Sequence, residues 1–245
     1  MTDTAAAPLA DDLDFRAADG PAATPRPLML VLPGGGYVAH ADHEGRVIAD
    51  WLAGLGVNAL TLRYPVAPAR HPDALLRAQE VVAAARTGTL DLGENVDRSR
   101  IGVIGFSAGG HLAAQLSTAA QSAARVDLAV LAYPVVSMVH EPHAGSLESL
   151  LGPASAPHAR RELSQELRVD RFTPPTFLWH TGEDDAVPVS HSLRYASALA
   201  EHDVPFELHV FEGGGHGRGL ARGEGPLEQW APLCALWLGQ RGWLG

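Results

Sequence analysis

The sequence of 245 residues lacks lysine altogether and has a single cysteine, Cys234. One cysteine cannot form an internal disulfide, and the apolar stretch around it (residues 230–238) predicts a buried structural thiol. No apolar run reaches the roughly 18 residues that a membrane-spanning helix needs. The first twenty residues have four aspartates by position 14 and no apolar core, so they do not resemble a secretory signal. We therefore expect a cytoplasmic protein.

Basic residues are outnumbered by acidic ones, 18 to 28, which gives a formal net charge of −10. No basic cluster is present, so neither nucleic acid nor an anionic membrane is expected as a partner. Hydrophobic residues make up 46% of the chain and charged residues 19%, a globular composition that excludes a disordered or fibrous protein. The length suits one α/β domain, and the oligomeric state is not indicated.

Short apolar runs alternate with helical patterns six times along the chain. Unbroken runs such as residues 28–32 predict buried strands, and the apolar periodicity of segments such as residues 44–55 predicts amphipathic helices. This alternation indicates the α/β class, with a mostly parallel sheet covered by helices on both faces. The other expected strands are residues 57–62, 101–104, 127–132, 176–179 and 206–211, and the other expected helices are residues 72–86, 108–121, 190–202 and 229–238.

Two segments lack the periodicity of helices and strands, and they indicate how the domain is organised. Residues 1–26 are rich in alanine, aspartate and proline, and predict a loose N-terminal arm with one short strand near residues 13–16. Residues 27–245 are then expected to form a single domain. Within it, about residues 135–175 show only two short helical patches, at 147–151 and 159–167. An insertion of this length in a compact domain is usually functional, so we expect a short cap after the fourth strong strand.

The loop after the predicted strand at 101–104 contains a candidate nucleophile. It reads Gly105-Phe106-Ser107-Ala108-Gly109, which matches the G-x-S-x-G pattern. A nucleophile on a sharp strand-to-helix turn needs small neighbours, because the helix must pass close to the strand. The pattern alone is weak in a chain with 26 glycines. Its position directly between an apolar strand and a helix favours Ser107 as a nucleophile over a plain glycine-rich turn.

Three consecutive glycines follow the first strong strand, between Pro33 and Tyr37. Glycines leave backbone amides unshielded and able to converge on an anion, as an oxyanion hole requires. A phosphate-binding Walker loop is excluded, because no Gly-Lys-Ser/Thr follows and the chain has no lysine. The loop is therefore a candidate oxyanion loop, with a simple flexible turn as the alternative.

A candidate base and three candidate acids follow the last two strands. His216 lies in a glycine-rich loop after residues 206–211, and Glu183, Asp184 and Asp185 stand in a row after residues 176–179. A serine hydroxyl needs an imidazole base near neutral pH, and the base needs a carboxylate to fix its tautomer. The order serine, acid, histidine is that of α/β-hydrolases, and neither chymotrypsin-like nor subtilisin-like enzymes share it. The pattern leaves the choice of acid open.

Taken together, these segments resemble those of small bacterial α/β-hydrolases grouped with acetyl esterases and xylan acetylesterase-like carboxylesterases. The resemblance spans residue 28 to the C-terminus and implies the α/β-hydrolase fold. It places the acid three residues before Val187, and this selects Asp184 beside Ser107 as nucleophile and His216 as base. The resembling segments are PGGGY at 33–37, GFSAGGHLA at 105–113, HTGEDDAVP at 180–188 and FEGGGHG at 211–217.

The same resemblance implies that the amides of Gly35, Gly36 and Ala108 form the oxyanion hole. The chemistry then needs no metal and no organic cofactor. Two histidine pairs at i, i+3 spacing, His40/His43 and His140/His143, have no cysteine partner and no HExxH pattern, so we interpret them as surface or cap residues. His180, at the end of a strand, is expected to brace the acid loop.

Three aromatic residues near the predicted site, Tyr37, Phe106 and Tyr133, suggest a modest acyl pocket suited to short chains such as acetyl. The expected function is a carboxylesterase of the acetyl esterase type, a serine hydrolase acting on small-molecule esters such as acetylated sugars. The same triad can also hydrolyse an amide or formamide, so a formamidase or small peptidase is the alternative. A non-catalytic binding module is a further one, because fold does not determine function.

Overall fold

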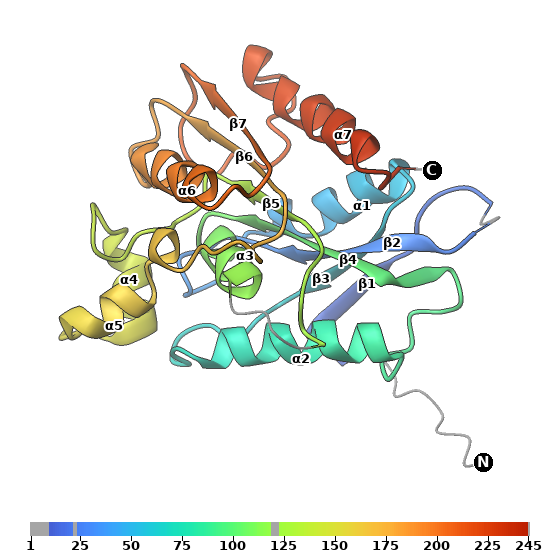
Figure 1. Ribbon diagram of the computed structural model, residues 1–245, viewed down its shortest axis with the longest axis horizontal. Coiled ribbons are helices and arrows are strands. Elements are labelled where there is room, and N and C mark those ends of the chain that lie inside the picture. The colour runs from blue at the N-terminus through green and yellow to red at the C-terminus, as the bar shows by residue number, and fades with distance from the viewer. Residues whose placement is uncertain (1–9, 22–23, 119–122, 245) are drawn as a thin grey trace.

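The computed structural model describes residues 10–21, 24–118 and 123–244 (Figure 1). These residues contain one seven-stranded sheet in the order β1-β3-β2-β4-β5-β6-β7. Neighbouring strands run parallel except at one edge, where β1 pairs antiparallel with β3. The strands are β1 Leu13–Arg16, β2 Arg26–Leu32, β3 Asn58–Leu62, β4 Val96–Phe106, β5 Ala129–Ala132, β6 Thr176–Thr181 and β7 Phe206–Phe211.

Helices cover both faces of this sheet (Figure 1). Buried side chains of α1 and α7 form one hydrophobic cluster with one face, and those of α2, α3 and α6 form a second cluster with the opposite face. The expected α/β-hydrolase fold, a mostly parallel sheet between two helical layers, is therefore confirmed. These helices are α1 Arg46–Gly54, α2 Asp73–Thr87, α3 Ala108–Thr118, α6 Ser190–Glu201 and α7 Trp230–Gln240.

The central strand β2 shows why its sequence is apolar throughout. Leu28, Leu30 and Leu32 belong to the cluster with α2 and α3, while Met29 and Val31 belong to the cluster with α1 and α7. Successive side chains of a strand point to opposite faces. A strand covered on both faces therefore carries hydrophobic residues at every position, and this is the pattern that predicted it.

The winding of the chain reverses at β2, because β3 lies on one side of it and β4 on the other. In open α/β sheets, ligands bind at such a switch point, beyond the carboxyl ends of the strands. The loops that leave β2 and β4 meet at this edge. The sheet thereby positions the candidate oxyanion loop beside the candidate nucleophile.

The insertion between β5 and β6 carries the short helices α4 and α5 at one end of the sheet (Figure 1). The predicted patch at 147–151 corresponds to α4. The predicted patch at 159–167 is divided by residues 163–164 into α5 and a short 3-10 helix, η2. The bounds are α4 Ala144–Leu151, α5 Pro157–Glu162 and η2 Gln165–Leu167; two further 3-10 helices are η1 Asp42–Glu44 and η3 Gly225–Gln229.

The short strand predicted within the N-terminal arm is confirmed. The expected strand over Leu13–Arg16 is present as β1 and pairs with β3 along its length, whereas residues 1–9 and 22–23 lie outside the described ranges. The helix predicted over 108–121 extends through Thr118, and its predicted last turn also lies outside them. Cys234 is fully buried, as predicted. No helix in the described ranges is long and apolar enough to cross a membrane.

Candidate active site

Ser107 occupies the turn between β4 and α3. Its φ of 52° lies in the left-handed region, a strained conformation for serine that the surrounding structure must hold in place. The backbone N–H of Ser107 donates to the Ala132 carbonyl, and its carbonyl accepts from the Val135 amide, both at 3.0 Å. A Cβ on Gly109 would lie 2.1 Å from the Leu32 carbonyl oxygen. Glycine is therefore required there for α3 to pass β2 so closely.

Three predicted side chains form a continuous hydrogen-bonded chain. His216, in the loop after β7, has its Nε2 atom 2.7 Å from Ser107 Oγ. Its Nδ1 atom lies 2.7 Å from Oδ2 of Asp184, in the loop after β6. The Asp184 side chain is fully buried, while the His216 ring remains 21% exposed. This is the arrangement expected of a nucleophile, a base and an acid that orients the base.

Several further groups hold the Asp184 carboxylate. Its Oδ1 atom accepts from the amides of Ala186 at 3.0 Å and Val187 at 2.8 Å, and His180 Nε2 lies 3.3 Å from Oδ2. Burial by itself would raise the pKa of this carboxyl. Hydrogen bonds from His180, His216 and the loop backbone outweigh burial and hold the pKa of Asp184 well below its usual range. The carboxylate therefore stays ionised.

The two acidic neighbours of Asp184 are both exposed. Glu183 accepts from the Gly214 amide, at 3.4 Å from its Oε2 atom. His180 lies 2.8 Å from the Val187 carbonyl through Nε2 and 2.7 Å from Ser192 Oγ through Nδ1. It therefore braces the acid loop, as predicted from its place at the end of a strand.

The glycine loop after β2 lies against the nucleophile. A Cβ on Gly34 would sit 3.1 Å from Ser107 Cβ, and Gly35 has a φ of 129°, which strains any other residue. Within the described ranges, the amides of Gly35 and Gly36 donate to no protein acceptor. The Ala108 amide opens α3, where the first N–H groups have no intrahelical partner. The three amides predicted for an oxyanion hole are thus available to an anion.

The three aromatic residues predicted to line an acyl pocket are buried instead. Tyr37, Phe106 and Tyr133 are 2%, 0% and 1% exposed. The Tyr37 hydroxyl lies 2.8 Å from Nδ1 of His111, and the Phe106 ring packs against those of Tyr133 and Trp230. Side chains engaged in this way offer no surface to an acyl group. These three residues therefore pack inside the protein beside the site and do not line an acyl pocket.

A buried carboxylate that no sequence motif indicated ties the loops of the site together. Glu44 is 2% exposed; its Oε2 atom accepts from the Gly34 amide at 2.7 Å, and its Oε1 atom accepts from the Tyr133 hydroxyl at 2.5 Å. The same hydroxyl accepts from the Gly219 amide at 2.8 Å. The Tyr133 ring also packs edge-on against His216, with centroids 5.0 Å apart. Glu44 and Tyr133 therefore link the oxyanion loop to the base loop.

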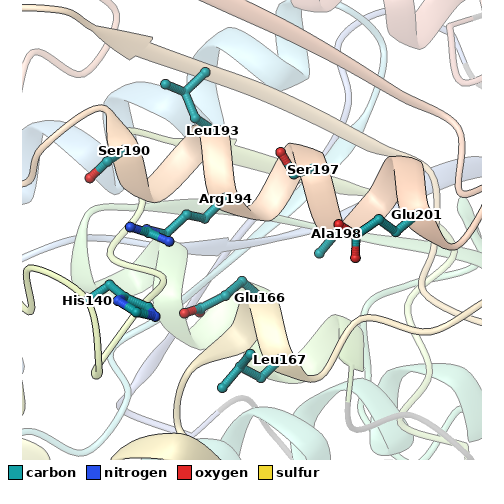
Figure 2. Close-up of a pocket in the computed structure, with 9 residues that line it drawn as sticks. All are labelled: His140, Glu166, Leu167, Ser190, Leu193, Arg194, Ser197, Ala198 and Glu201. Atoms are coloured by element: carbon teal, nitrogen blue, oxygen red, sulfur yellow. The ribbon is translucent and has the colours of Figure 1, made fainter.

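A separate pocket of about 470 Å³ lies between α6 and η2 (Figure 2). None of Ser107, Asp184 and His216 lines it. Arg194, Glu166 and His140 are arranged around it from three different segments of the chain. The complete lining is His140, Glu166, Leu167, Ser190, Leu193, Arg194, Ser197, Ala198 and Glu201.

A family model matches part of this chain, and curated proteins are similar to most of it. The prolyl oligopeptidase family model matches residues 78–231, more than half of the chain. The acetylxylan esterase of Xylanibacter ruminicola is 30% identical over 197 residues, which cover 77% of this chain and 40% of that protein. Endo-1,4-beta-xylanase B of Butyrivibrio fibrisolvens is 34% identical over 214 residues, covering 81% and 33%. The chain thus spans two fifths or less of the length of these two curated relatives.

A solved structure extends the similarity to nearly the whole chain. The acetyl ester-xyloside bifunctional hydrolase of Caldicellulosiruptor lactoaceticus has a TM-score of 0.90 and 40% identity, and the match covers 95% of this chain and 89% of that one. The sequence resemblance to acetyl esterases is thereby confirmed. On these matches, the chain belongs to the prolyl oligopeptidase family and is an acetyl esterase-like α/β-hydrolase.

Proposed function

We propose that this chain is a serine carboxylic-ester hydrolase that removes short acyl groups, acetyl above all, from small-molecule esters such as acetylated sugars. The observation that carries the proposal is the hydrogen-bonded chain from Ser107 through His216 to Asp184, with both links at 2.7 Å. Relatives named acetylxylan esterase and acetyl ester-xyloside hydrolase support acetyl esters as the substrate class.

The reaction begins when Ser107 Oγ attacks the ester carbonyl carbon and His216 Nε2 takes the hydroxyl proton. The carbonyl oxygen becomes negative and is held by the amides of Gly35, Gly36 and Ala108. The tetrahedral intermediate then collapses, the bond to the alcohol oxygen breaks, and that oxygen receives the proton from His216. The acyl group remains on Ser107. Water attacks this acyl-enzyme with His216 again as base, and the carboxylic acid leaves.

Asp184 supports both steps without giving up its charge. Its Oδ2 atom accepts from Nδ1–H of His216, so the imidazole keeps Nε2 free to take the serine proton. When the ring becomes positive, the buried carboxylate stabilises it. The hydrogen bonds that hold the pKa of Asp184 low keep that negative charge in place through the cycle.

Replacement of the nucleophile tests the proposal directly. Ser107→Ala should lower kcat for p-nitrophenyl acetate by about 10⁴-fold or more, because one missing triad member removes the covalent route. The purified variant should keep the far-UV circular dichroism of the parent. A fluorophosphonate probe should label the parent one to one and leave the variant unlabelled. Turnover by the variant within tenfold of the parent would end the proposal.

A substrate series separates the proposal from its alternatives. p-Nitrophenyl esters from acetyl to dodecanoyl should show kcat/KM falling with chain length, and acetylated xylan should release acetate. An aryl formamide and a short peptide are measured beside them. Faster turnover of the formamide or the peptide than of any acetate would assign the triad to amide hydrolysis. A parent protein that reacts with no phosphonate would be a binding module.

A further inference from the structure

His143 brings an imidazole from the cap to the oxyanion loop. It is the N-cap residue of α4, and its ring is half-buried. Its Cε1 atom lies 3.9 Å from the position that a Cβ on Gly36 would occupy. The ring therefore borders the loop whose amides face the reacting carbonyl in the proposed mechanism, although it belongs to a different part of the chain.

The first turn of α4 fixes which nitrogen of His143 carries the proton. The Nδ1 atom accepts the backbone N–H of Ser146 at 3.2 Å and lies 2.8 Å from the Ser146 hydroxyl. A ring nitrogen that accepts an N–H is unprotonated, so the neutral ring carries its proton on Nε2. Burial, and then charge repulsion from His216, lower the pKa of His143. The ring is thus neutral near neutral pH, with one N–H to donate.

That N–H has no acceptor among the described residues. Within residues 10–21, 24–118 and 123–244, both hydrogen bonds of the His143 ring use Nδ1, and Nε2 bonds to nothing. The Val38 side chain also lies near Gly36: it is 60% exposed, and its Cγ2 atom is 3.9 Å from the same Cβ position. A free donor and an exposed apolar side chain thus stand together at the oxyanion loop.

The chemistry of an acetyl ester restricts what this donor can meet. The carbonyl oxygen is assigned to the oxyanion amides, and the rest of the acyl part is a methyl group without an acceptor. Apart from the ester oxygen, which takes its proton from His216, every remaining acceptor belongs to the alcohol. A sugar presents hydroxyl oxygens beside the ester together with apolar C–H surface, and these match the donor and the valine.

We propose that His143 is a specificity-determining residue whose Nε2–H donates to a hydroxyl oxygen next to the ester in the alcohol part of the substrate. The inference rests on the proposed esterase function and names a contact within the same site. It assigns the preference for polyol and sugar acetates to the cap, through one neutral hydrogen bond.

Two small esters that differ by one hydroxyl test this contact: trans-2-hydroxycyclohexyl acetate and cyclohexyl acetate. The measured quantity is the ratio of their kcat/KM values. The variant His143→Asn keeps an N-cap oxygen for the Ser146 amide, because asparagine is a strongly preferred N-cap residue, but it lacks the Nε2–H donor. The parent should prefer the hydroxylated ester. In His143→Asn the ratio should fall about fivefold, which corresponds to one neutral hydrogen bond.

The matched control is His140→Asn, the same substitution three residues earlier in the cap. His140 lies in the separate pocket with Glu166 and Arg194 (Figure 2), so this variant should keep the ratio of the parent. A parental ratio in His143→Asn, an equal loss of ratio in both variants, or a parent without preference would each overturn the contact. A parent that hydrolyses neither acetate and none of the p-nitrophenyl esters would instead overturn the proposed function.

Discussion

Asp184 has an acidic residue on either side, and the structure buries only the middle one. Asp184→Asn should lower kcat by about 10³- to 10⁴-fold, because an amide at this place favours the wrong tautomer of His216. Asp185→Asn and Glu183→Gln, the matched neighbours, should stay within roughly tenfold of the parent because both side chains are exposed. Steady-state kinetics on p-nitrophenyl acetate compares the three. If Asp185→Asn were the inactive variant, the catalytic acid would be Asp185 and not Asp184.

The pH dependence of the reaction follows from the same carboxylate. Hydrogen bonds hold the pKa of Asp184 well below its usual range, so it remains ionised wherever the protein is active. We expect the acidic limb of kcat/KM to have a slope of one on logarithmic axes, because Asp184 adds no second ionisation to it. The profile is measured with chemistry as the slow step. A second acidic limb in the usual carboxyl range would show that Asp184 titrates during activity.

At the scale of single residues, loop position along the chain was a good guide to the candidate catalytic residues. It was a poor guide to the residues that line the acyl pocket. Ser107 and His216 lie in glycine-rich loops directly after strands, and such a position is readable from local pattern. Tyr37 and Tyr133 were predicted in an acyl pocket, yet both have positive φ, at 62° and 36°. This left-handed conformation is uncommon for residues other than glycine, and the neighbours of these tyrosines along the chain do not indicate it.

Among the elements of the site, the loops after β2 and β7 are coupled through Glu44 and Tyr133. Glu44→Gln can still accept the Gly34 N–H through its amide oxygen, but its amide nitrogen then faces the Tyr133 hydroxyl, so the Tyr133 O–H loses its carboxylate acceptor. We expect kcat to fall roughly 10- to 100-fold with a smaller change in KM, because a shift of about 1 Å in catalytic groups costs about that much. Glu94→Gln, an exposed counterpart far along the chain, serves as the control.

A double-mutant cycle with Tyr133→Phe shows whether the two residues act as one unit. The losses in kcat of Glu44→Gln and Tyr133→Phe should be less than additive in the double variant, because either change breaks the same link between loops. Fully additive losses in kcat would show that the two residues act independently. An unchanged kcat with a lower melting temperature would show that their contact only stabilises the fold.

Helix boundaries explain why Glu44 escaped prediction. The apolar periodicity indicated a helix over residues 44–55, and an acidic residue at the start of such a helix is ordinarily solvent-facing. In the structure, η1 ends at Glu44 and α1 begins at Arg46. The break between the two helices turns Glu44 inward. Periodicity indicated one helix here and no separate η1, whereas the turn of the backbone at Glu44 depends on contacts made by distant residues.

Across the whole molecule, burial lowers the pKa of five histidines: His40, His71, His111, His143 and His191. His111 is the extreme case, with a pKa of about 4. Below about pH 6.5 the unfolded chain takes up protons that the folded chain refuses, so stability falls as the pH drops toward 4. At pH 5, His111 alone should account for about 2 kcal/mol of lost stability.

Melting temperatures between pH 7 and pH 5 check this linkage. The parent Tm should fall steadily over this range, above the pH at which carboxyl groups take up protons. His111→Gln removes one of the buried titrating rings, so its Tm should depend less steeply on pH even where the variant is less stable at pH 7. Parallel Tm curves for parent and variant would contradict the assignment to His111.

The fold as a whole was the most predictable level, because central strands such as β2 are covered on both faces and leave an apolar run in the sequence. The single-domain organisation of residues 27–245 remains our proposal, supported by the one sheet that includes β2 to β7. Contacts such as those of Glu44 with Tyr133 and of His143 with the oxyanion loop could not be predicted from the sequence. They join residues whose separation along the chain is large and whose meeting depends on how the cap and loops pack.

The buried position of Cys234 determines how the protein can be labelled. Its side chain is inaccessible, and burial raises the pKa of the thiol, so little thiolate is present to react with alkylating reagents. The sequence also has no lysine, so amine-directed reagents find no side chain to modify. A cysteine introduced at an exposed site would then be the one reactive handle in the folded chain. A maleimide dye at position 140 would report on the cap without removal of the native thiol.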